Sequence, residues 1–171
     1  MDASSGVRDG KLVMLVDDGV ESRRQTRHLL ELRGMEVVQA SNGMAALGLI
    51  QRLPYSFRLV VTELELPGIS GAVLMGALRL FRPDLPVLCI SGSRTGAGVP
   101  AVAGCLRKPL QDSELHAAME AVLRGGTTEW EPRFTDVLSE SATARVRARF
   151  AVGNDLVEAA LELARVSERG V

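Results

Sequence analysis

The sequence predicts an α/β fold in which five parallel strands form one doubly wound sheet with helices on both faces. Short aliphatic runs alternate with amphipathic stretches throughout residues 11–124. The aliphatic runs are almost continuous, as expected of strands that helices bury on both faces. Glycine or proline follows the amphipathic stretches, which is typical of helix ends. Repeats of this kind build a parallel sheet with right-handed connections.

Five aliphatic runs are the expected strands. The first, at residues 12–16, reads LVMLV and has no polar residue. The second is weaker because a glutamate and a glutamine enclose its two valines. The expected strands are 12–16, 36–39, 59–62, 87–90 and 104–106.

Four amphipathic stretches are the expected helices between and after these strands. Gly34 ends the first helix, and Pro54 and Pro83 follow the second and third. The last helix has Asp112 or Ser113 as its expected cap and ends before a pair of glycines. The expected helices are 20–33, 44–52, 73–81 and 111–124.

One repeat lacks a convincing helix. Residues 92–103, between the fourth and fifth strands, contain three glycines and a proline. Each glycine in a helix costs about 1 kcal/mol relative to alanine. We therefore expect a loop or a single turn where the fourth helix of the fold belongs.

Charge and hydropathy exclude several classes of function. The chain of 171 residues has 20 basic and 21 acidic side chains, and 46% of its residues are hydrophobic. Nucleic-acid binding is not expected, because proteins that hold phosphates usually carry a basic excess. No apolar run approaches the roughly 20 residues that span a bilayer. We expect a cytoplasmic protein with no membrane segment and a disordered N-terminus at residues 1–10.

The composition changes after the repeats and indicates a second part of the chain. We expect a first domain at residues 11–125, a linker at 126–134 and a helical tail at 135–171. The tail has two amphipathic stretches, 135–150 and 155–168, hinged at Gly153 and Asn154, with Asn154 as a cap. Short amphipathic helices cannot bury an apolar face alone. Residues 135–168 are therefore expected to hold a homodimer or a partner, and the alternative is that they fold back on the first domain.

Polar side chains stand at the ends of four predicted strands. The carboxyl ends of parallel strands form the usual ligand-binding edge of such a sheet. Carboxylates brought together there need a divalent cation, a lysine or a proton between them. The candidate site residues at this edge are Asp17, Asp18, Glu63, Glu65, Ser91 and Lys108.

Four segments give the sequence a family resemblance. They read LVDDGVESRRQTRHLLELRGMEVVQASNGMAAL, LVVTELELPGISG, LPVLCISGS and GCLRKPL, in this order. Over roughly residues 10–124 the chain resembles the receiver domain of bacterial two-component response regulators. The resemblance implies the flavodoxin-like receiver fold.

The resemblance also implies roles for individual residues. Asp17 and Asp18 match the acidic pair that holds magnesium, and the backbone carbonyl of Glu65 matches the main-chain metal ligand. Ser91 matches the hydroxyl residue that follows a bound phosphoryl group, and Lys108 matches the lysine that pairs with that group.

Glu63 departs from the family pattern. By the resemblance it stands where receivers carry the aspartate that accepts a phosphoryl group from a histidine kinase. One added methylene displaces the carboxylate and lets it reach toward Lys108 and Ser91. We expect normal phosphotransfer to be lost, magnesium to bind weakly if at all, and no cofactor to be required. Whether Glu63 locks an active-like state or belongs to an inert packing module stays open.

The region that forms the usual output surface of the family also departs from the family pattern. Cys105 stands where the family usually carries a switching Tyr or Phe, and the stretch between Ser91 and Lys108 is shorter than usual. Cys89 and Cys105 are expected to be neighbours inside the sheet, as small buried hydrophobes rather than redox partners. His28 and His116 are expected to be surface residues.

The leading interpretation is a pseudo-receiver that is not an enzyme. It would act in two-component signal transduction through contact with a histidine kinase or another signalling protein. Two alternatives stay open: a receiver that still takes part in a phosphorelay by accepting a phosphoryl group, and a transcription regulator.

Overall fold

A computed structural model describes residues 10–53, 56–92, 105–124 and 155–168. Its centre is a single sheet of five parallel strands in the order β2-β1-β3-β4-β5. The predicted fold class is therefore confirmed. The order reverses at β1, so the carboxyl ends of β1 and β3 stand side by side where ligands bind in sheets of this kind.

The strands lie close to their predicted positions. β1 is buried along its whole length because both faces of the sheet are covered, whereas the edge strand β2 is largely exposed or half-buried. β3 is longer than predicted at both ends and includes Glu63. The bounds are β1 Leu12–Val16, β2 Glu36–Ala40, β3 Phe57–Glu63, β4 Val87–Ser91 and β5 Cys105–Arg107.

The helices also match their predicted stretches to within two residues at either end. Gly34, with a φ of +76°, follows the first helix and allows the left-handed turn that ends it. The bounds are α1 Val20–Leu32, α2 Gly43–Arg52, α3 Gly71–Phe81, α4 Asp112–Leu123 and α6 Leu156–Glu168.

Two predicted helix caps are wrong. The residue before α4 is Gln111, and its side chain makes no capping hydrogen bond, so neither Asp112 nor Ser113 is the cap. The first helical turn instead gains two carboxylates that suit its positive end, from Asp112 and Glu114. For α6 the cap is Asp155 rather than Asn154, because its carboxylate accepts the N–H groups of the second and third helical residues.

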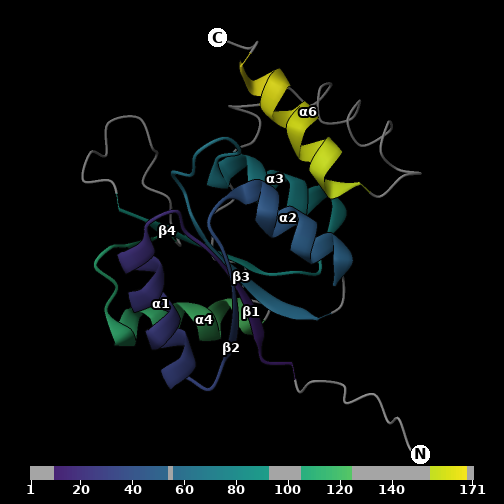
Figure 1. Cartoon of the computed structure of the whole chain (residues 1–171). Coiled ribbons are helices and arrows are strands. Elements are labelled where there is room, and N and C mark those ends of the chain that lie inside the picture. Colours follow the sequence, from purple (N-terminus) through teal and green to yellow (C-terminus); the bar gives the residue numbers. More distant parts are fainter. Residues whose placement is uncertain (1–9, 54–55, 93–104, 125–154, 169–171) are drawn as a thin grey trace, which may run out of the picture.

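Helices cover the sheet in two layers, and each layer has its own core. Helices α1 and α4 lie on one face, and α2 and α3 lie on the other (Figure 1). Met14 and Val60 face α2 and α3, while Leu15 and Val61 face α1 and α4. The alternation along β1 and β3 follows from the two-residue repeat of a strand.

Helix α6 adds a third layer to the α2 and α3 side. It runs across both helices in Figure 1, and its apolar residues belong to the same core cluster as theirs. Leu156, Ala159, Ala160 and Leu163 are at most 4% exposed. This packing agrees with the alternative that the tail folds back on the first domain, and the homodimer or partner contact expected of residues 135–168 stays a prediction.

Several predicted features lie outside the described residues. They are the disordered N-terminus, the loop in place of a fourth helix, the linker at 126–134, the first tail helix at 135–150 and the hinge at Gly153 and Asn154. Among the helices that are described, none is long and apolar enough to cross a membrane.

Candidate functional site

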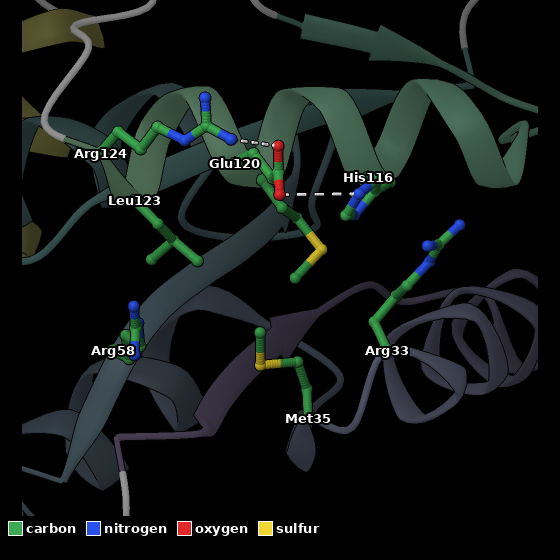
Figure 2. Close-up of a pocket in the computed structure, with 8 residues that line it drawn as sticks. Arg33, Met35, Arg58, His116, Glu120, Leu123 and Arg124 are labelled. Atoms are coloured by element: carbon green, nitrogen blue, oxygen red, sulfur yellow. Dashed lines mark hydrogen bonds and ion pairs between the residues drawn. The ribbon is translucent and has the colours of Figure 1, made fainter.

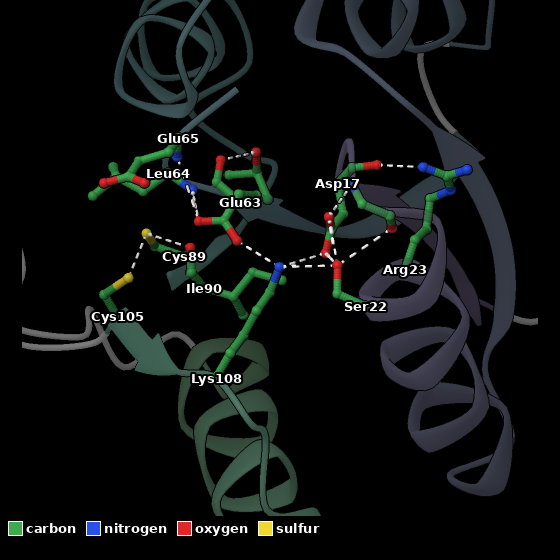
Figure 3. Close-up of polar contacts among 12 residues, drawn as sticks. Asp17, Ser22, Arg23, Glu63, Leu64, Glu65, Cys89, Ile90, Cys105 and Lys108 are labelled. Carbon is green, nitrogen blue, oxygen red and sulfur yellow. Dashed lines mark hydrogen bonds and ion pairs between the residues drawn. The ribbon is translucent and has the colours of Figure 1, made fainter. Parts of the chain in front are cut away.

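The structure brings three of the predicted site residues together at the carboxyl edge of the sheet. Asp17 follows β1, Glu63 ends β3, and Lys108 follows β5 (Figure 3). The Asp17 and Glu63 residues are 0% and 4% exposed. Asp18 and Glu65 are exposed instead. The two carboxylates at the centre of the site are therefore those of Asp17, after β1, and Glu63, at the end of β3.

Lys108 lies between these two buried carboxylates. Its Nζ is 2.6 Å from Asp17 Oδ2 and 2.5 Å from Glu63 Oε2. The predicted reach of Glu63 toward Lys108 is confirmed. One ammonium thus neutralises part of the repulsion between two carboxylates, which is one of the three ways in which such a pair can coexist.

The two ion pairs control the pKa of Lys108. Burial alone would lower that pKa, because it disfavours the charged ammonium. The hydrogen bonds to Asp17 and Glu63, together with their negative charges, outweigh burial and raise the pKa above its ordinary value. Lys108 therefore stays charged at neutral pH and holds the site together.

Residues at the start of α1 fix Asp17. The N–H of Gly19 donates to Asp17 Oδ1 at 2.9 Å, and Ser22 Oγ lies 2.8 Å from both carboxylate oxygens. Lys108 Nζ also lies 3.2 Å from Ser22 Oγ, and Arg23 Nη1 donates to the backbone oxygen of Asp17. Both carboxylate oxygens of Asp17 are therefore already hydrogen-bonded.

The loop after β3 fixes Glu63. Its Oε1 accepts the N–H of Leu64 at 2.9 Å, with a longer contact of 3.4 Å from the N–H of Glu65. The first residue of α3, Gly71, lies against this loop: a Cβ there would stand 2.1 Å from the backbone oxygen of Glu63. Only glycine allows this close approach. Both oxygens of Glu63 are thus engaged, and its backbone is held by the start of α3.

Ser91 and Cys105 lie at the neighbouring strands β4 and β5. Ser91 is half-buried, and its backbone oxygen accepts the N–H of Lys108 at 2.9 Å. Cys105 pairs in register with Cys89, and the two Sγ atoms share a hydrogen bond. The prediction that the two cysteines are neighbours is confirmed, although only Cys89 is fully buried.

Ser22 and Gly71 contribute to the site and were not identified from the sequence. Ser22 stands in the first turn of α1, and no pattern in the sequence indicates that this turn lies over Asp17. Gly71 follows Ser70, whose side chain caps α3, and a glycine at a helix start beside a strand end suggests close packing.

A hollow lies at the opposite edge of the sheet, beside the starts of β2 and β3. Its volume is about 290 Å³, and it is lined by residues that include Arg33, His116 and Arg124 (Figure 2). Arg33 is paired with Asp112, and Arg124 and His116 are both paired with Glu120. Of the two histidines singled out, His28 is exposed and His116 is half-buried.

The comparison with protein families decides the relationship of the chain. Residues 13–120 match the family model described as the response regulator receiver domain. The chain belongs to the response-regulator receiver family. The match includes the end of every described strand, and therefore all of the site residues at the carboxyl edge.

Curated relatives of this receiver agree with the assignment. It is 34% identical over 119 residues to a transcriptional regulatory protein CpxR homolog of Haemophilus influenzae, a match over 66% of this chain and 50% of the relative. It is 33% identical to the nitrate/nitrite response regulator protein NarP of Escherichia coli, over 75% of this chain and 61% of NarP. The matches thus span about half to three fifths of these relatives.

Solved structures show the same fold. The receiver domain of the hybrid histidine kinase CckA is 28% identical, with a TM-score of 0.56 over 66% of this chain and 98% of that domain. A response regulator receiver domain protein from Clostridium thermocellum is 23% identical, with a TM-score of 0.60 over 67% of this chain and 94% of the other. The second likeness concerns the fold alone.

The site of this receiver is a poor fit for the magnesium ion that the family resemblance implies. Among the described residues, no group of three or more His, Cys, Asp or Glu side chains is placed to hold a metal ion. The oxygens of Asp17 and Glu63 are occupied by Lys108, Ser22 and backbone N–H groups. Magnesium demands near-octahedral oxygen coordination, and this arrangement does not offer it.

Proposed function

We propose that this receiver belongs to two-component signalling as a pseudo-receiver that is not switched by phosphorylation of an aspartate. The observation that carries the proposal is the buried bridge from Lys108 to Asp17 and Glu63. By the family resemblance, Lys108 pairs with a bound phosphoryl group. Here Glu63, in the acceptor position, already holds that lysine, so its carboxylate supplies the negative charge that a phosphoryl group would bring.

The geometry of Glu63 supports the loss of phosphotransfer. Its added methylene displaces the carboxylate, and a displacement of about 1 Å can lower a rate by a factor of about 100. Both of its oxygens are also engaged, one by Lys108 and one by the loop after β3. A nucleophile held in this way is poorly placed for in-line attack on a phosphoryl donor.

We propose that the chain acts by binding a protein rather than as an enzyme, in the cytoplasm, with a histidine kinase or another signalling protein as the partner. One relative, 30% identical over 65% of this chain, is the sensor kinase CckA of Brucella abortus, which supports a place beside such kinases. Any homodimer contact within residues 135–168 would have to avoid the buried face of α6. Magnesium is proposed to bind weakly, since Asp18 is the one member of the acidic pair whose carboxylate is exposed.

A transcription regulator is the second candidate. It is supported by the name of the CpxR homolog, a transcriptional regulatory protein about twice as long as the matched segment. The net charge of −1 gives no support to nucleic-acid binding by this chain itself.

The test is phosphorylation of the full chain by acetyl phosphate with magnesium, measured by intact-mass spectrometry. We expect no phosphoryl adduct on the natural chain, and an adduct on Glu63→Asp, which restores the shorter side chain. Glu63→Gln is the matched control, since it keeps the length of glutamate and removes the nucleophile. A phosphoryl group mapped to Glu63 in the natural chain would contradict the proposal.

A further inference from the structure

The two cysteines of the chain lie side by side on neighbouring strands. Cys89 is in β4 and Cys105 begins β5, and the two residues pair in register. Figure 3 shows their sulfur atoms pointing toward one another, beside the backbone of Ile90. They are present as free thiols.

The strand pairing gives the cysteines a geometry that suits a disulfide. Neighbouring strands lie about 4.7–4.9 Å apart, within the range of about 4.4–6.8 Å between the Cα atoms of bonded cysteines. Partners in register point to the same face of a parallel sheet, so their Cβ atoms do not diverge. The two Sγ atoms contact one another, so bond formation needs little movement.

The two thiols differ in exposure. Cys89 is 1% exposed, whereas Cys105 is half-buried and can meet a small oxidant. The hydrogen bond with Cys105, burial and the negative charge of Glu63 together raise the pKa of the Cys89 thiol. Cys105 is therefore the thiol placed to react first, and Cys89 is the thiol placed to resolve the product.

We propose that Cys89 and Cys105 are a redox modification site that closes to an intramolecular disulfide on reaction with hydrogen peroxide. The Cys105 thiol loses its proton, and the thiolate attacks a peroxide oxygen. The O–O bond breaks, a sulfenic acid forms on Cys105, and the hydroxide that is released takes up a proton and leaves as water. Cys89 Sγ then attacks the Cys105 sulfur and loses its proton, the S–O bond breaks, and a second water leaves. Two thiols are oxidised and one peroxide is reduced to two waters.

The disulfide would act next to the site at the carboxyl edge. It would tie β5 to β4 three residues before Lys108, whose backbone N–H already bonds to Ser91. The proposed disulfide involves Cys89 and Cys105, whereas the proposed loss of phosphotransfer depends on Glu63 and Lys108. The two proposals can therefore fail separately.

The test is to treat the reduced full chain with a modest excess of hydrogen peroxide, to denature it, and to alkylate the remaining thiols with iodoacetamide. Intact-mass spectrometry should show a monomer lighter by two hydrogens that carries no alkyl group. A reducing agent should restore two alkylatable thiols. In a native labelling time course, Cys105 should react faster than Cys89.

Three results would overturn the proposal: two alkylatable thiols after peroxide, a disulfide between two chains, or sulfinic acid on Cys105 as the main product. Cys89→Ser is the matched control, because it keeps Cys105 and removes the resolving thiol. It should stop at the sulfenic acid, which the reagent dimedone traps. Because the principal test uses the natural chain, it holds even where a variant fails to fold.

Discussion

Lys108 holds together two carboxylates that would repel one another across the ends of β1 and β3. Asp17 is fully buried and Glu63 nearly so, and the side chain of Lys108 is 18% exposed. Removing one member of a buried ion pair leaves an uncompensated charge, which costs more than the pair itself contributes. The stability of the site therefore depends on this single ammonium.

Replacing Lys108 with methionine should destabilise the chain by about 3–5 kcal/mol at neutral pH, because Asp17 and Glu63 then face each other without a cation. The free energy of unfolding in urea measures the loss. The matched control is Lys11→Met, at the one other lysine of the chain, which is exposed and should change little. If the two substitutions lowered the free energy of unfolding equally, the result would contradict the bridge from Lys108 to Asp17 and Glu63.

The stabilisation by Lys108 should also depend on pH. Its folded-state pKa is raised above the unfolded value, so the contribution is complete below the unfolded pKa and is lost as the pH rises through the folded one. The difference in unfolding free energy between the natural chain and Lys108→Met should thus shrink above about pH 10.4, the ordinary lysine pKa. A difference that stays constant to still higher pH would count against this view.

At the scale of single elements, the start of α3 positions the end of β3. The helix begins at Gly71, its cap Ser70 accepts the N–H of Val73 at 3.3 Å, and the N–H of Gly71 donates to the oxygen of Leu64. The hydrogen bond from Gly71 to Leu64 therefore ties the end of the loop after β3 to its start. Any side chain at position 71 would push the helix away from the strand.

Gly71→Ala should destabilise the chain although alanine is the better helix former. The added Cβ would stand 2.1 Å from the oxygen of Glu63 and 2.8 Å from the Cα of Leu64, so backbone must move. The matched control is Gly48→Ala in α2, where a Cβ meets only the end of Arg52 at 3.9 Å. The control should gain up to about 1 kcal/mol. Thermal unfolding compares the two, and a stabilised Gly71→Ala would refute the close contact.

Hydrophobic patterns predicted the elements well because they report burial directly. β1 and the ends of α1 and α3 follow from aliphatic runs, from Gly34 and from Pro83. The cap of α4 was mistaken because Asp112 suits both a cap and a first helical turn, and the choice depends on backbone angles that the sequence does not specify. For the same reason, Asn154 was predicted as the cap of α6, where the structure has Asp155.

At the scale of the whole molecule, α6 makes residues from the far end of the chain part of the first core. Leu156 and Leu163 share a cluster with Leu74 and Leu78 of α3. The N–H of Leu156 also donates to the side chain of Gln51 in α2 at 3.1 Å. The apolar face of α6 therefore shares one core with α2 and α3.

Leu163→Ala should destabilise the whole chain by about 2–5 kcal/mol, because Leu163 is 1% exposed and its removal leaves a cavity between α6 and the helices beneath it. Urea unfolding should give a single transition shifted to lower denaturant. Glu158→Ala, on the exposed side of the same helix, is the control and should change little. A loss confined to a separate transition of the tail would contradict a shared core.

The sequence could not decide where the tail packs. An amphipathic face predicts that residues such as Leu156 and Leu163 are buried, but it does not name the surface that covers them. The reach of Glu63 toward Lys108 was predictable, because both stand at ends of strands in one sheet. The role of Ser22 was not, since it depends on how the first turn of α1 lies over Asp17.

The central claim is that Glu63 holds Lys108, and titration of the Lys108 Cε signal by NMR tests it most directly. The chain has only two lysines, so Lys11→Arg assigns the signal. We predict a pKa of Lys108 above the ordinary value of about 10.4, and a lower pKa of Lys108 in Glu63→Gln. The account would be contradicted if the pKa of Lys108 were at or below the ordinary value and did not change in Glu63→Gln.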